Sequence, residues 1–527
     1  MSMMKKNRDI IYIALIITII IITFYNSFYN GFVWDDERNI INNSYLRDFS
    51  LKNLKNILFY SYDGSIQPVK SLSYFIQYNL WKLNPLPYHI WNIILYITNV
   101  ILIYFFIIDI SKSSVIAFIT CILFSVHPLH SEIVAALFGK EYMYGSIFFL
   151  ASLLLFIKYL KREKKYIYIL SIILYIMALM SKEFTLALFP LFILYDFTFV
   201  NRLNIKNLCR RFFIYIPFII SSFLFLYILM AYTERVRAVS GLSALFNLLM
   251  DIEIFTLFYF SKLLYPIRLH PMYNIKGLYL TYMILSLFIF LLIFLSLIIS
   301  WKKSKSVFYM TLWLLIGLIP HSHFIIPVTF VAADRYIYFS SLSLSFFFSL
   351  ILLKLYNFRN DRQYRLFSIA LMITIISLYM NITISQNRIW ENNLILWSYV
   401  TSSEDDYKDM GLAFNYLGDS YIKNNEPERA IEAYNKSLIY SKDKYTIKIK
   451  LGLLFLETGD YDSAIRHLED AKKLRSNSTE VYNNLALAYL YKGMKDRAAE
   501  EYRKSLSLDP FQGDIKKNLD IIVNSGL

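Results

Sequence analysis

Long apolar runs without a charged residue limit the fold of this chain more than any other feature. Ile10–Phe24 and Thr281–Ser300 are two examples. A helix needs about 20 predominantly apolar residues to cross the hydrocarbon core of a bilayer. Eleven segments are candidate spans, at residues 10–29, 89–109, 113–130, 142–158, 166–180, 184–200, 212–231, 279–300, 306–320, 339–356 and 366–384. The sequence therefore predicts an all-α, polytopic helical bundle in a membrane.

The composition excludes an ordinary soluble enzyme. Hydrophobic residues make up 57% of the chain and charged residues only 18%, whereas globular proteins average roughly 45–50% and 25%. A net charge of +15 is compatible with nucleic-acid binding. However, the basic residues lie in short connections between apolar runs, as they do in membrane proteins, so we expect no nucleic-acid partner. Two cysteines, Cys121 and Cys209, form no zinc or disulfide pattern.

The basic connections predict the orientation of the spans. Lysine and arginine gather at residues 5–8, 158–165, 202–211, 302–305 and 354–365. Connections of this kind stay in the cytoplasm. Eleven spans place all five groups there only if Ile252–Pro266 does not cross and is instead re-entrant or interfacial. We therefore expect a cytoplasmic N-terminus and a C-terminal tail on the outer face, in the plasma (inner) membrane of a prokaryotic cell.

The same alternation gathers the polar segments on the outer face. These segments are residues 30–88, 127–141, 181–183, 232–278 and 321–340. Charged residues at the rim of a membrane are costly unless they are paired or used. Their grouping on one face is the first indication of a functional site.

The tail contains an internal repeat. Gly418, Gly452 and Ala486 stand 34 residues apart, and Ala430, Ala464 and Ala498 show the same spacing. This is the period of the tetratricopeptide repeat (TPR), a helical hairpin. We predict a membrane domain at 1–390 with an outer loop at 30–88, and a soluble domain at 391–527 with about three repeats in 411–510. Stacked repeats present a groove for a peptide or protein, although they also serve as stability or oligomerisation modules.

Three consecutive acids, Asp35, Asp36 and Glu37, follow the first span. Neighbouring carboxylates raise one another's pKa. Such a cluster suits a base that takes a proton from a hydroxyl group, or a divalent cation bound by Asp36 and Glu37. The alternative is a solvated loop start with a capping aspartate.

Other titratable residues sit at three further span ends on the predicted outer face. Pro128 breaks the helix beside the first group. The groups contain His127, His130, Glu132, Lys140 and Glu141, then Lys182 and Glu183, then Asp334 and Arg335. Arginine, lysine and histidine suit an anionic leaving group. Interfacial histidines, a simple ion pair and a rim arginine are the alternatives.

At these residues the chain resembles the transmembrane and TPR-containing protein O-mannosyltransferases, within the GT-C glycosyltransferases. The motifs that carry the resemblance are Trp34-Asp35-Asp36, Pro87–Asn92, His127–Ala135, Ser181-Lys182-Glu183, Leu263–Pro266 and Asp334–Tyr338, followed by the repeats. Gln67-Pro68-Val69 stands where the family tends to have Arg-Pro-Leu, and Lys140 stands where arginine is common. The short repeat array is typical of a prokaryotic member.

The resemblance implies inverting transfer of a sugar, such as mannose, from a polyprenyl-phosphate donor to a hydroxyl group of a protein. Asp35 would be the base and Asp36 its support. Donor phosphate contacts would come from Arg335, Lys182, Lys140 and His130, with supporting roles for His127, Glu132, Glu141, Glu183 and Asp334. A lipid or cell-envelope glycan is an alternative acceptor. A non-catalytic TPR scaffold or a transporter is the alternative from another class.

Overall fold

The computed structural model describes residues 2–48, 50–59, 61–62, 65–201, 203–232, 250–273, 280–322, 332–402 and 410–524. Parts of three predicted outer segments lie outside the described residues, at 49, 60, 63–64, 233–249, 274–279 and 323–331, as does Arg202. The chain divides into two compact units, Met1–Asn392 and Asn393–Leu527.

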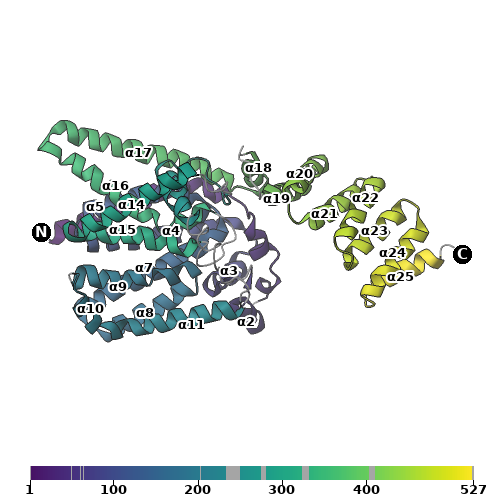
Figure 1. The fold of residues 1–527 in the computed structure, drawn as a ribbon, viewed down its shortest axis with the longest axis horizontal. Helices are drawn as coiled ribbons and strands as arrows, with labels where there is room; N and C mark the ends of the chain where they lie inside the picture. The colour runs from purple at the N-terminus through teal and green to yellow at the C-terminus, as the bar shows by residue number, and fades with distance from the viewer. Residues whose placement is uncertain are drawn as a thin grey trace. The chain divides into compact units, whose positions relative to one another are not determined.

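The first unit is a bundle of long apolar helices (Figure 1). Its main helices are α1 (Ser2–Phe24), α4 (Pro85–Ser111), α5 (Ser114–Ser125), α7 (Lys140–Arg162), α8 (Lys165–Leu179), α9 (Pro190–Tyr195), α11 (Ile216–Tyr232), α14 (Leu280–Lys303), α15 (Lys305–Leu318), α16 (Ser341–Tyr356) and α17 (Arg362–Ile389). Among the described residues, eight helical segments are long and apolar enough to cross a membrane, and a bent pair is a ninth candidate. The predicted polytopic helical fold is thus confirmed.

The number of crossings stays a prediction. Every one of the eleven predicted spans falls on a helical segment, but α8 and α15 have only 15 and 14 residues. The bent pair joins α5 to Pro128–Ala135 with a 60° break. Pro128 causes this break because it lacks an N–H and disfavours a helical conformation before it. His127 is accordingly extended, and its Nδ1 accepts a hydrogen bond from the Leu129 N–H at 3.4 Å.

Contacts between distant segments show which connections of the first unit lie at the same end of the helical bundle. At one end Asp109 pairs with Lys161, Asp196 pairs with Arg211, and the Ser306 hydroxyl donates to the Ile110 carbonyl. The Arg8 side chain reaches Ser114 at this same end. Four of the five groups of basic residues predicted to be cytoplasmic therefore share one end of the bundle, and Figure 1 shows the connection between α16 and α17 at the same end.

The segment predicted not to cross is helical. It comprises a π-helix at Ile254–Phe258 and α13 (Tyr259–Leu264). Its C-terminal carbonyls lie at the end opposite the basic connections, where Leu263 and Leu264 bond to His127 and Tyr379. Because only the C-terminal end of the segment is placed in this way, its predicted failure to cross the membrane stays a prediction.

The first loop is folded into a small layer at that opposite end. It contains α2 (Leu51–Phe59), a two-residue strand pair formed by β1 (Ser61–Tyr62) and β2 (Ser65–Ile66), and α3 (Pro68–Trp81). Its apolar cluster includes Ile40, Leu46, Tyr74 and Phe75, and it closes against Leu137. The loop is therefore packed onto the N-terminal end of α7.

The second unit confirms the predicted repeats. Three antiparallel helix pairs follow one another: α19 (Met410–Lys423) with α20 (Pro427–Tyr440), α21 (Lys444–Glu457) with α22 (Tyr461–Leu474), and α23 (Thr479–Tyr491) with α24 (Lys495–Leu508). Two helices flank them, α18 (Asn393–Ser402) and α25 (Gly513–Asn524). Trp397 of α18 stacks on Tyr416 of α19, with ring centroids 4.6 Å apart. The unit thus begins before the first repeat.

The small residues of the repeat allow each helix pair to approach closely. A Cβ atom at Gly452 would lie 2.5 Å from Leu468 Cγ, and one at Gly418 would lie 2.4 Å from the Tyr434 ring. Gly452→Ala is expected to destabilise the unit by about 1–3 kcal/mol through overpacking. The measurement is the temperature at which trypsin begins to cleave residues 393–527 of the purified chain. Gly513→Ala, with nothing near its Cβ, is the control; equal behaviour of both variants would contradict this account.

Candidate functional site

A buried amide network holds the chain where α1 ends and the site begins. The Asn387 side chain of α17 donates to the Thr23 carbonyl and to Asn26, both at 3.0 Å. Its Oδ1 accepts a hydrogen bond from the Ser131 hydroxyl at 2.6 Å. The Gly31 N–H donates to the Glu391 carbonyl at 2.9 Å. Because three distant segments meet here, the turn that follows has a defined position.

The acidic turn places its carboxylates in different environments. Asp36 is fully buried, and its Oδ2 accepts a hydrogen bond from the Val33 N–H at 3.1 Å. Its Oδ1 has no hydrogen-bond partner in the part of the chain that is described. Burial raises the pKa of Asp36, while the Val33 N–H and the Lys140 ammonium group offset part of that rise. Asp35 is only partly buried and Glu37 begins a short π-helix.

Lys140 is buried next to the acidic turn and does not lie on an open surface. Its ammonium group donates to the Gln77 side chain at 2.8 Å and lies 4.4 Å from the ring centroid of Tyr74. The side chain is completely buried. Its charge acts on Asp36. Lys140 therefore acts electrostatically on Asp36 from a buried position, and its contact with a lipid phosphate stays a prediction.

A second cluster joins the first loop to two other segments. Glu141 forms ion pairs with Lys70 of α3 and with Lys182, the latter at 2.7 Å. Lys182 also lies 3.4 Å from Glu183. The side chains of Lys70 and Lys182 are each 13% exposed. Pairing at this depth is expected because an unpaired buried charge is costly.

Arg335 forms the third cluster. Its Nη1 pairs with the buried Glu132 and donates to the Pro271 carbonyl at 3.1 Å, and its backbone N–H donates to Glu132 at 3.1 Å. The guanidinium carbon lies 5.9 Å from the Trp34 ring centroid. The negative charge of Asp35 repels the carboxylate of Glu132. Arg335 and the acidic turn therefore belong to one site.

Asp334 lies on the buried side of this cluster. It accepts a hydrogen bond from the Tyr273 hydroxyl at 2.8 Å and is almost completely buried. Burial raises the pKa of Asp334, and the neighbouring Glu132 raises it further. Asp334 thereby ties the turn that carries Arg335 to Tyr273.

The two histidines lie within the packed bundle. His130 is hydrogen-bonded through Nδ1 to the Tyr96 hydroxyl at 2.7 Å and through Nε2 to the Ser341 hydroxyl at 3.0 Å. His127 bonds to the Leu263 carbonyl at 3.0 Å. Both ring nitrogens of His130 thus bond to hydroxyl groups of the bundle, and its predicted contact with a lipid phosphate stays a prediction. The histidines connect the bent pair to α13, α4 and α16.

Several residues of the site were not predicted from the sequence. Lys70, Gln77, Tyr142 and His321 lie where no motif marked them, and Tyr336 lies in the Asp334–Tyr338 motif but had no predicted role. Lys70 carried the strongest available signal, because it follows Gln67-Pro68-Val69, where the first loop departs from the family pattern. Among the described residues, no group of three or more histidines, cysteines or acids could hold a metal ion. A cation at Asp36 and Glu37 stays a prediction.

The fold and the site define a polytopic membrane protein with a charged site at one end of its bundle and a C-terminal TPR unit. The tetratricopeptide repeat family matches residues 413–443 and 449–513. The repeats at 34-residue spacing are thereby identified independently of the spacing itself.

Sequence similarity to named relatives extends beyond the repeats. A protein O-mannosyl-transferase of Caenorhabditis elegans is 26% identical over 422 residues, which cover 75% of this chain and 58% of the relative. Protein O-mannosyl-transferase TMTC3 of Homo sapiens is 35% identical over 153 residues, covering 27% of this chain and 16% of the relative. The chain is thus a TPR-containing homologue of the protein O-mannosyl-transferases, and it spans little more than half of the first relative's length.

A third relative matches a much shorter stretch. The photosystem I assembly protein Ycf3 of Synechococcus is 39% identical over 85 residues, which cover 16% of this chain and 49% of the relative. Relatives of different names therefore share segments with this chain, so a short match does not identify an activity.

Proposed function

We propose that this chain is an inverting glycosyltransferase that moves a sugar from a polyprenyl-phosphate donor to a hydroxyl acceptor, on the non-cytoplasmic face of the membrane. The observation that carries the proposal is the assembly of Asp35, Arg335 and Lys182 at the bundle end opposite the basic connections. The names of the relatives favour mannose and a protein acceptor.

The chemistry assigns a separate task to each charged group. Asp35 takes the proton of the acceptor hydroxyl as its oxygen attacks the anomeric carbon of the sugar. The bond between that carbon and the phosphate oxygen breaks, and its electrons pass to the lipid phosphate. Arg335 and Lys182 stabilise the added negative charge. Because Glu132 and Glu141 already hold these cations, little reorganisation is needed during the reaction.

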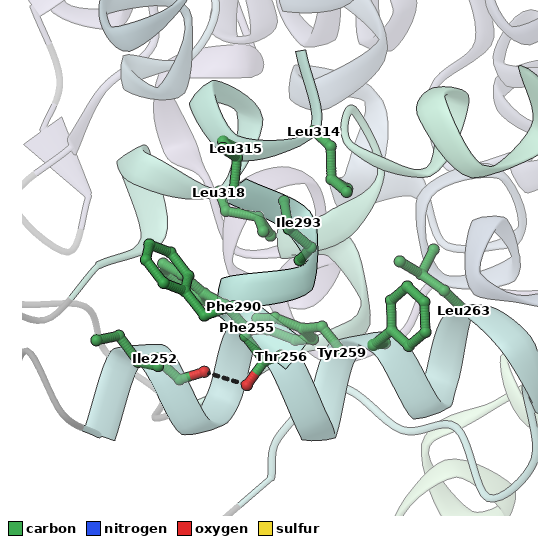
Figure 2. Close-up of a pocket in the computed structure, with 11 residues that line it drawn as sticks. Ile252, Phe255, Thr256, Tyr259, Leu263, Phe290, Ile293, Leu314, Leu315 and Leu318 are labelled. Atoms are coloured by element: carbon green, nitrogen blue, oxygen red, sulfur yellow. Dashed lines mark hydrogen bonds between the residues drawn. The ribbon is translucent and has the colours of Figure 1, made fainter. Parts of the chain in front are cut away.

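An apolar pocket suits the lipid part of such a donor. It lies between the helical segment 252–263, α14 and the end of α15, and has a volume of about 50 Å³ (Figure 2). Phe255, Tyr259, Phe290 and Leu318 are among its lining residues. The Tyr259 hydroxyl accepts a hydrogen bond from the Ala333 N–H at 3.4 Å, two residues before Arg335. A lipid chain in this pocket would bring its phosphate toward the cations.

Filling this pocket is expected to weaken donor use. Ile293→Trp places a larger side chain in the pocket. We expect the KM for a long-chain donor to rise about tenfold, whereas the KM for a donor of one or two isoprene units should change less. Leu292→Trp is the matched control, because Leu292 is 47% exposed and does not line the pocket. Equal kinetics of the two variants with long-chain donor would remove the pocket from the donor site.

The identity of the acceptor is tested with labelled donor. Membranes that contain the chain are incubated with polyprenyl phosphate carrying a radiolabelled sugar, and the label is separated into protein and lipid fractions. Label in protein, sensitive to mild alkali, supports transfer to serine or threonine. Label in lipid or glycan alone would replace the acceptor assignment, and absence of any transfer would favour the scaffold or transporter alternative.

A further inference from the structure

Two tyrosine hydroxyls near Arg335 have no partner within the described part of the chain. Tyr142 is the third residue of α7, and Tyr336 lies in the 3-10 turn Asp334–Ile337. Their residues are only 3% and 6% exposed. Neither hydroxyl makes a hydrogen bond with any described residue, and neither oxygen is among the fully enclosed atoms that lack a partner, so both oxygens remain accessible. Phenol groups of largely buried tyrosines ordinarily bond to a partner, so two accessible hydroxyls without one in the same site suit a ligand that accepts hydrogen bonds.

The rings of both tyrosines are held in place by their neighbours. The ring of Tyr336 stacks on His321 with centroids 4.3 Å apart and an interplanar angle of 8°. The ring of Tyr142 stacks on Phe184 at 5.5 Å and lies 6.3 Å from the same His321. Both phenols therefore belong to one aromatic group, and the stacking leaves little freedom for their hydroxyls.

The two cations of the proposed donor site flank this aromatic group. The Lys182 ammonium group lies 5.5 Å from the ring centroid of Tyr142, and the Arg335 guanidinium carbon lies 5.2 Å from that of Tyr336. The charges of both cations act on Tyr142, and Arg335 acts on both tyrosines. An anion that contacts Lys182 and Arg335 together would therefore lie beside the rings of the two tyrosines.

We propose that Tyr142 and Tyr336 donate hydrogen bonds to the phosphate of the lipid donor and complete the site formed by Arg335 and Lys182. The inference rests on the proposed function and adds two neutral donors to it. Transfer of the sugar converts a phosphate diester into a monoester, which gains negative charge. Hydrogen bonds to charged oxygens are stronger than neutral ones, so these hydroxyls hold the leaving group more tightly as the reaction proceeds.

The test measures binding without requiring turnover. The purified full-length chain in detergent is titrated with a short-chain polyprenyl monophosphate, and with the corresponding polyprenol as the probe that lacks phosphate. Tyr142→Phe and Tyr336→Phe each remove one oxygen and keep the stacked ring. Each is expected to weaken binding of the monophosphate by about ten- to a hundredfold and to leave polyprenol binding unchanged.

A matched tyrosine at the other end of the bundle provides the control. The Tyr168 hydroxyl donates to the Ile214 carbonyl at 2.8 Å, so Tyr168→Phe also removes one phenol oxygen but leaves the site intact. Monodisperse elution on size exclusion checks that each variant is folded, and either tyrosine variant alone is sufficient for the test. A parallel increase in the donor KM would agree with a direct phosphate contact.

Each outcome separates the inference from the proposed function. Wild-type affinity for the monophosphate in both tyrosine variants would overturn the role of the hydroxyls and leave the donor assignment intact. If the wild-type chain binds the monophosphate no better than the polyprenol, both the donor assignment and the inference fail. A loss confined to the tyrosine variants, with unchanged polyprenol binding, supports both.

Discussion

Asp35→Asn is expected to lower the rate of sugar transfer by about 10²–10⁴-fold, the usual contribution of a positioned base. Asparagine keeps the size of the side chain but cannot accept the proton of the acceptor hydroxyl. Asp35 is the more accessible of the first two acids in the turn, because Asp36 is completely buried. The measurement is initial transfer of labelled sugar from polyprenyl phosphate, at saturating donor.

The control for this variant is the same substitution where chemistry is not expected. Asp361 caps α17 at the end that carries the basic connections, where its Oδ1 accepts a hydrogen bond from the Gln363 N–H at 2.9 Å. Asparagine is an equally good capping residue, so Asp361→Asn should transfer sugar normally. Near-normal transfer by Asp35→Asn would remove Asp35 from the role of base.

Arg335→Gln is expected to reduce the rate of sugar transfer by about 10²–10³-fold. The variant loses a preorganised hydrogen-bond donor to the negative charge that develops on the leaving phosphate. Arg335→Lys should recover only part of this rate, since lysine keeps the charge but not the planar fork. Transfer is measured over a range of donor concentrations, so that effects on kcat and on KM are separated.

A double variant distinguishes loss of phosphate binding from damage to the fold. Arg335→Gln leaves Glu132, which is 2% exposed, without its ion-pair partner, and an unpaired buried charge is strongly destabilising. Adding Glu132→Gln removes that charge. If the double variant is stable but still inactive, Arg335 acts on the donor. If it regains transfer, the loss in the single variant was structural, and the assignment of Arg335 to the phosphate is withdrawn.

Properties that depend on local periodicity could be predicted from the sequence alone. Apolar runs predicted the helices of the first unit, and Gly418, Gly452 and Ala486 predicted the three repeats. The boundaries of crossing segments were less predictable. The helices α8 and α15 are shorter than an ordinary span, and Pro128 bends the segment that follows α5. Hydropathy reflects the free energy of transferring a segment from water into lipid. It does not determine the path of that segment through the bundle.

The candidate site was predictable in its residue types but not in their pairing. The acids after α1 and the basic residues at later span ends were all visible as charges that are costly near a membrane. Nothing in their spacing showed that Lys70 of the first loop would share Glu141 with Lys182. Nor did it show that both nitrogens of His130 would bond within the bundle.

The sequence by itself determined that the chain forms membrane-embedded helices followed by a stack of helical hairpins, because periodicity and apolar length act within one segment. Only the tertiary structure decided which charges face which partners. Ion pairs and hydrogen bonds require contact at a few ångströms between segments hundreds of residues apart, as between Glu132 and Arg335. Tyr142 and Tyr336, whose hydroxyls have no partner among the described residues, come together around His321 only at that level, because packing decides which donors remain without a partner.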